Sequence, residues 1–81
     1  LVISDMEAKI YPNPASKTVT IEVPGLKQLE IMDISGRTIF AETDIDSNKH
    51  QLDISTIASG VYFIRLKSDK YMTIRKLVID K

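Results

Sequence analysis

The chain has no cysteine, no tryptophan, a single histidine and no long apolar run. Without cysteine, disulfide bridges and thiolate metal sites are excluded. No stretch approaches the about 20 apolar residues of a membrane-spanning helix. Only five of the 81 residues are Phe or Tyr, so Ile, Val and Leu must form most of the core. A chain of this length has room for one domain.

Glycine is also scarce, and the three glycines, Gly25, Gly36 and Gly60, are isolated, which indicates turns rather than a phosphate-binding loop. The net charge is zero but uneven. Residues 1–60 hold five Lys or Arg against nine Asp or Glu (−4), and residues 61–81 hold six against two (+4). This indicates either a face for an acidic partner or solvated strand faces that partly neutralise each other. It falls short of the basic excess of a nucleic-acid binder, so no nucleic-acid partner is expected.

What the chain does contain is a period of two. Residues 17–23 alternate, with Val19, Ile21 and Val23 on one face and polar residues on the other, as in a strand with one dry face. Pro24-Gly25 is expected to end this strand in a turn. The alternation shifts around Met32 and Ile34, which indicates a bulge near Asp33 or burial of both faces.

Further strands are predicted between polar turns, and Ser55–Ser59 is expected to form one helical turn, capped by Ser55 and ended by Gly60. About seven short strands with turn signals between them predict an all-β, two-sheet sandwich. The predicted strands cover residues 8–11, 17–23, 28–33, 37–42, 50–54, 61–66 and 71–79.

Catalytic and metal motifs are not found. His50 opens a strand beside a polar loop, so a solvent-facing histidine is expected, and no serine lies in a nucleophile-elbow motif. Asp44–Asn48 resembles the start of a calcium loop, but the sixth position is Lys49 rather than Gly and the twelfth is Ser55 rather than Glu. We therefore expect no enzyme, no cofactor and no small-molecule substrate.

Four motifs in order carry a resemblance. The first begins with Tyr11, Pro12, Asn13 and Pro14, the second spans Asp33, Gly36 and Arg37, the third spans Gly60, Tyr62, Ile64 and Leu66, and the last is Lys76–Lys81. Their order and spacing over residues 8–81 resemble the C-terminal sorting domain of the type IX (Por) secretion system of Bacteroidetes.

This resemblance implies an immunoglobulin-like sandwich and a role as the secretion signal of a larger exported protein. The implied route is periplasmic transit, recognition by the outer-membrane translocon, removal by a sortase-like surface protease and attachment of the cargo to the cell surface or its release. Residues 1–7 would be the linker end and cleavage region, and residues 8–81 the sorting domain. Because the chain begins at Leu1 rather than Met, we expect it to be part of a longer precursor.

Most motif residues are interpreted as determinants of the fold, with Arg37 pairing with Asp33 across its turn and Tyr62, Ile64 and Leu66 in the core. The last strand is expected at a sheet edge with free backbone groups, where a partner strand, or a second copy of the chain, could add. The predicted contact residues are those of the last strand and its end: Arg75, Lys76, Leu77, Val78, Ile79 and Lys81.

Two other functions compete with sorting. A carbohydrate-binding or adhesive module would display exposed aromatic rings on a flat face, and only Tyr71 is expected to be exposed. A purely structural module would support a neighbouring catalytic domain without directing export.

Overall fold

The fold is a β-sandwich, and no helix occurs in the computed structural model, which describes residues 2–3 and 7–81. The predicted all-β class is therefore confirmed. The strands are β1 (Val2–Ile3), β2 (Lys9–Tyr11), β3 (Thr18–Leu26), β4 (Gln28–Met32), β5 (Thr38–Glu42), β6 (Ser47–Asp53), β7 (Gly60–Lys67) and β8 (Tyr71–Ile79).

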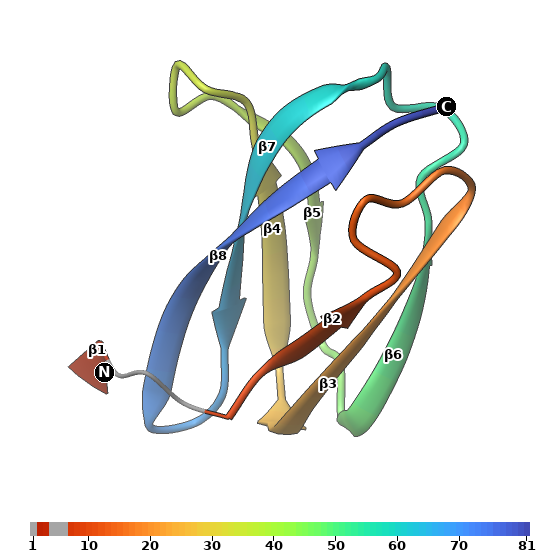
Figure 1. The fold of residues 1–81 in the computed structure, drawn as a ribbon. Coiled ribbons are helices and arrows are strands. Elements are labelled where there is room, and N and C mark those ends of the chain that lie inside the picture. The colour runs from red at the N-terminus through yellow and green to blue at the C-terminus, as the bar shows by residue number, and fades with distance from the viewer. Residues whose placement is uncertain (1, 4–6) are drawn as a thin grey trace.

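The strands form two sheets (Figure 1). One has the order β1-β8-β7-β4-β5 and the other the order β2-β3-β6. All pairings are antiparallel except that of β1 with β8. The seven antiparallel strands follow an immunoglobulin-like arrangement, but the fourth of them, β5, pairs with β4 rather than with β6. In constant-type immunoglobulin domains the fourth strand lies in the other sheet.

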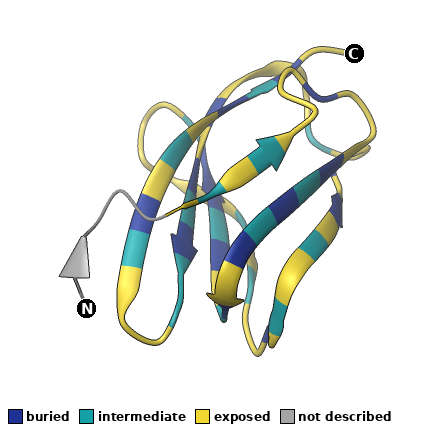
Figure 2. Cartoon of the chain, turned by 60° about the horizontal axis from the view of Figure 1, so that its bottom comes forward, coloured by how far each residue is buried: buried dark blue, intermediate teal, exposed yellow. Residues whose placement is uncertain are grey.

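The core lies between the sheets and is aliphatic, as the composition requires. The predicted inward residues Val19, Ile21 and Val23 of β3 are fully buried. Leu29 and Ile31 of β4 and Ile64 and Leu66 of β7 face them from the other sheet and are equally buried. Figure 2 shows the resulting bands of buried and exposed residues along the strands. Segments with this alternation form strands because a sheet then has one apolar face, which it buries against the other sheet.

The predicted turn at Pro24-Gly25 is wrong. β3 continues through both residues to Leu26, which is buried and pairs with Ser47 after a register shift. Gly25 has a φ of 66°, and its N–H donates to the side-chain oxygen of Asn48 at 2.9 Å. Positive φ and a side-chain partner are features of a bulge, and the chain crosses to the other sheet only at Lys27.

The predicted helical turn at Ser55–Ser59 is also wrong. Asp53, not Ser55, caps this segment, because its carboxylate accepts the N–H of Ser55 at 2.8 Å. A single turn follows, in which the N–H of Ile57 donates to the carbonyl of Ile54 at 3.0 Å. The side chains of Ile54 and Ile57 pack on the core, which holds the segment flat against the sandwich.

Two other irregular sites agree better with expectation. The register of β4 against β5 shifts between Ile31 and Met32, which is the irregularity expected near Asp33. Ile31 and Met32 are also both buried, so both faces of β4 are covered at this point. The loop before β6 is mostly polar as expected, but its Ile45 is 6% exposed and packs into the core. Of the predicted linker end, residues 1 and 4–6 lie outside the described residues.

Candidate functional site

The first motif and the last strand, which are far apart in the sequence, are joined in the fold. The side-chain amide of Asn13 donates to the carbonyl of Lys76 at 3.0 Å, and its oxygen accepts the N–H of Val78 at 2.9 Å. Ala15 continues this pairing with its backbone: its N–H donates to the carbonyl of Val78 at 2.9 Å, and its carbonyl accepts the N–H of Asp80 at 2.8 Å. Ala15 is buried, so the segment after the two prolines is anchored in the core.

This pairing corrects the expectation of a free edge at the end of the chain. In β8 the even-numbered residues direct their backbone groups away from β7, as the contacts of Lys76, Val78 and Asp80 show. Those groups are already bonded by Asn13 and Ala15. At the other end of β8, the short strand β1 pairs with Tyr71 and Met72. Among the described residues, Ile74 lies between these two covered stretches of β8 and is paired with neither β1 nor Asn13 and Ala15.

The predicted contact residues do not form one surface. Leu77 and Ile79 are buried in the core, whereas Lys76 is exposed and Val78 half-buried. The guanidinium of Arg75 donates to the hydroxyl of Thr73 at 2.7 Å on the core side of β8. Lys81 is held by the loop before β7, because its ammonium donates to the carbonyl of Ser55 at 2.6 Å. Lys76 and Val78 are therefore the predicted contact residues whose side chains lie on the outer face.

The second motif builds a tight turn on one carboxylate. Asp33 Oδ1 accepts the hydroxyl and the N–H of Ser35 and the N–H of Arg37, at 2.6, 2.9 and 3.1 Å. The predicted pair is confirmed, with Arg37 Nε 3.3 Å from Asp33 Oδ2. The hydroxyl of Ser35, the two backbone N–H groups and Arg37 together hold the pKa of Asp33 below its usual value. Gly36, with a φ of 90°, closes the turn in a conformation that side chains rarely adopt.

The third motif places a tyrosine at the start of β7. Tyr62 is 9% exposed and packs in the core beside Ile64, as predicted. Its hydroxyl donates to the carbonyl of Ala58, four residues upstream, at 2.6 Å. The same contact, a tyrosine that bonds back to the preceding corner, recurs in immunoglobulin-like sandwiches. Gly60, which the sequence predicts to end a helical turn, does not have a positive φ and instead begins β7.

His50 is not the solvent-facing residue that the sequence predicts. It lies opposite Ile21 on the core side of β6, and 22% of its side chain is exposed. Its Nε2 is 3.0 Å from a carboxylate oxygen of Glu42, so the residue links the edge strands of the two sheets. Alternation along β6, rather than the neighbouring polar loop, sets its direction.

The acidic loop before β6 uses its polar groups within the fold. Asp46 pairs with Lys27 at 3.0 Å, which raises the pKa of that lysine, and Asn48 bonds the bulge of β3. Among the described residues, no group of three or more His, Cys, Asp or Glu side chains could hold a metal ion. The same residues also form no helix that is long and apolar enough to cross a membrane.

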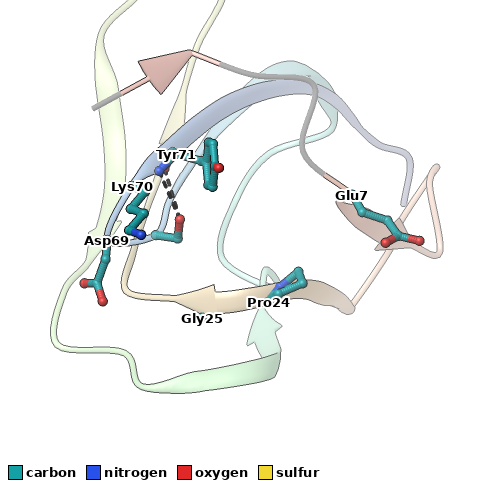
Figure 3. Close-up of a pocket in the computed structure, with 7 residues that line it drawn as sticks. Glu7, Pro24, Gly25, Asp69, Lys70 and Tyr71 are labelled. Carbon is teal, nitrogen blue, oxygen red and sulfur yellow. Dashed lines mark hydrogen bonds between the residues drawn. The ribbon is translucent and has the colours of Figure 1, made fainter.

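A hollow of about 380 Å³ opens at the end of the sandwich where the chain enters β2 (Figure 3). Pro24 comes from the bulge of β3, Tyr71 from the start of β8, and Glu7 lies at the opposite end from Asp69. The hydroxyl of Ser68 accepts the N–H of Tyr71, so it is engaged in the β7–β8 turn. Among the described residues, the lining offers one aromatic ring and charged side chains, without a nucleophile beside a base.

Exposed aromatic residues are more numerous than expected but do not share a face. Tyr71, Tyr11 and Phe63 are 44%, 40% and 39% exposed. Tyr11 lies on the outer face of the three-stranded sheet, where its hydroxyl donates to Glu22, whereas Phe63 lies on the outer face of the other sheet. Tyr71 lines the hollow. This arrangement lacks the flat aromatic platform on which a sugar ring stacks.

Sequence reasoning missed the side-chain pairing of Asn13 and the exposed apolar residues Phe63 and Ile74. A signal for Phe63 was available, because residues 61–66 carry apolar side chains on both faces of the strand. No comparable signal exists for Asn13, since its partners are backbone groups more than 60 residues away.

The fold and its motifs define a small, immunoglobulin-like module whose first and last segments are bonded together. No curated protein matches the chain. The model of the family "Secretion system C-terminal sorting domain" matches residues 9–80, and the chain belongs to this family. It is therefore a C-terminal sorting signal for type IX secretion, which directs export to the cell surface or the extracellular space and interacts with the secretion machinery.

Proposed function

We propose that this domain carries its cargo through the periplasm to the outer-membrane translocon, which recognises the folded sandwich rather than a linear tail. The family match over residues 9–80 is the observation that carries the proposal. The burial of Leu77 and Ile79 supports recognition of a folded surface, because these side chains are accessible only if the domain unfolds. Within β8, Lys76 and Val78 are the predicted contact residues that present side chains outward.

Removal of the domain after export is the second part of the proposal. A sortase-like surface protease would cut the chain before β2, within about residues 1–9, and the cargo would remain on the surface. Glu7 lies before β2 and is exposed, at the side of the hollow in Figure 3. A cut on this side of β2 would leave the pairing of Asn13 with β8 intact, so the released domain would keep its fold.

The test is a transfer of export to a foreign cargo. A signal peptide, a fluorescent protein and residues 1–81 are fused in that order and produced in a type IX-competent host. We expect fluorescence outside the cell or on its surface, and periplasmic retention in an otherwise identical strain that lacks the translocon. Retention in both strains would leave a structural role as the better assignment. The size of the exported product, with or without the domain, reports removal.

A further inference from the structure

The two outer faces of the sandwich differ in chemistry. On the three-stranded sheet, the outward positions of β2, β3 and β6 are polar or tyrosine apart from the exposed Pro24 of the bulge, since the buried residues alternate with them: Lys9, Tyr11, Thr18, Thr20, Glu22, Lys49, Gln51 and Asp53. This is the usual solvated side of an antiparallel sheet.

The outer face of β7 and β8 carries large apolar side chains instead. Val61, Phe63 and Ile74 are 42%, 39% and 47% exposed. The register places Val61 opposite Val78 and Phe63 opposite Lys76, and Ile74 is the diagonal neighbour of Phe63. These positions are adjacent on two paired strands, so the apolar side chains form one continuous patch rather than scattered single residues.

The charges around this patch have one dominant sign. The outward positions of β4, β7 and β8, all of them described, hold three cations, Arg65, Lys67 and Lys76, and one anion, Glu30, while a second anion, the exposed Asp80, follows the end of β8. Glu30 is already paired, with Arg65 at 3.2 Å and the hydroxyl of Thr38 at 3.1 Å. The face therefore presents unneutralised positive charge beside apolar surface. Two copies of the chain placed face to face would oppose these cations, so the face is not self-complementary.

We propose that this face, formed by the apolar Val61, Phe63, Ile74 and Val78 with Lys76 among them and Lys67 at the margin, is the docking surface for a protein of the secretion machinery. The partner surface is apolar at its centre and carries carboxylates opposite the lysines. The inference rests on the proposed sorting function and specifies where on the sandwich recognition takes place.

The test uses the fluorescent fusion with a triple substitution on this face, Phe63→Thr, Ile74→Thr and Lys76→Gln. A matched control makes three changes on the other outer face, Thr20→Ser, Lys49→Gln and Gln51→Thr. We expect the first variant to lose at least about tenfold in exported fluorescence and the control to stay within about twofold, since apolar anchors dominate such interfaces. Thermal unfolding of both purified fusions checks that the domains remain folded.

Several outcomes would overturn the inference. Export of the triple variant with Phe63→Thr, Ile74→Thr and Lys76→Gln at the wild-type level would exclude this face from recognition. Failure of the unsubstituted fusion to be exported counts instead against the proposed function. If sedimentation showed a wild-type dimer at about 100 μM that the triple variant loses, the occupant of the face would be a second copy of the chain. Binding of the wild-type fusion, but not the variant, to phosphatidylglycerol vesicles would make a lipid surface the occupant.

Discussion

The side-chain oxygen of Asn13 accepts the backbone N–H of Val78 across 65 positions of the sequence. Together with the bond from its amide to Lys76, this lets one side chain occupy the place that a further strand would take beside β8. The end of the domain is thereby tied to its beginning. The motif around Asn13 is thus explained as a closure of the sandwich.

Replacing Asn13 by Ala should destabilise the domain by about 1–3 kcal/mol, because two hydrogen bonds of about 0.5–1.5 kcal/mol each are lost. For a domain of this size, that lowers the melting temperature by roughly 4–8 °C per kcal/mol. Asn13→Asp is the matched variant: it keeps the acceptor for Val78 but loses the donor to Lys76. Its melting temperature should lie between those of wild type and Asn13→Ala. Equal melting temperatures for all three would contradict the closure.

The hydroxyl of Tyr62 provides a test of a local constraint, its bond to the carbonyl four residues upstream. Tyr62→Phe keeps the ring in the core but leaves the carbonyl of Ala58 without this donor. We expect a loss of about 1 kcal/mol, measured by urea unfolding. Tyr71→Phe is the control, since its ring is 44% exposed and its hydroxyl has no bond to the described residues. If both variants lose the same stability, the bond to Ala58 has no special role.

Local patterns predicted the strands well, because alternation reports directly which side chains are buried. β8 has the predicted bounds, Tyr71–Ile79, and the pair of Asp33 and Arg37 follows from a turn of five residues. The wrong predictions concern segments whose conformation depends on residues far away in the sequence. Pro24-Gly25 has the composition of a turn, but Asn48 bonds Gly25 and holds the strand together. The edge of β8 could not be judged from β8 alone, because Asn13 and Ala15 cover it.

Acid should weaken the domain through Asp33. Its pKa is held below the ordinary value of 3.8, so its charge stabilises the native state above that value. This contribution is lost as the pH falls from about 3.8 through the lower native pKa. Asp53, whose pKa is lowered by the N–H of Ser55 and by its hydroxyl, acts in the same direction.

Asp33→Asn should therefore be less stable than wild type at pH 7, and the difference should shrink in acid. Urea unfolding of both proteins at pH 7 and at about pH 2.5 measures this change. The Asn side chain can still accept the N–H groups of Ser35 and Arg37, so the turn itself should persist. A difference that stays constant between the two pH values would show that the charge of Asp33 contributes nothing.

Self-association through the edge of the last strand stays a prediction. The side chain of Asn13 should limit it, because it occupies backbone groups of β8 that a second copy would need. If strands of two copies pair along β8, removal of the Asn13 side chain opens the N–H of Val78 and the carbonyl of Lys76 for that purpose. Asn13→Ala should then raise the dimer fraction in sedimentation at about 100 μM, where a dissociation constant of that order gives comparable monomer and dimer. Wild type and variant sedimenting alike as monomers would rule out pairing at this edge.

Two glycines of the sorting motifs should respond differently to alanine. Gly36 has a φ of 90°, and although nothing lies within 4 Å of an added Cβ, the backbone conformation is strained for any side chain. Gly60 has no positive φ, and its added Cβ would meet the Tyr62 ring at 3.5 Å, an ordinary contact. We expect Gly36→Ala to cost about 1 kcal/mol or more and Gly60→Ala to be near neutral in urea unfolding. Gly36→Asn, which tolerates positive φ better, should recover part of the loss. If Gly60→Ala proved the more damaging change, close packing against Tyr62 rather than backbone freedom would explain the glycine of the third motif.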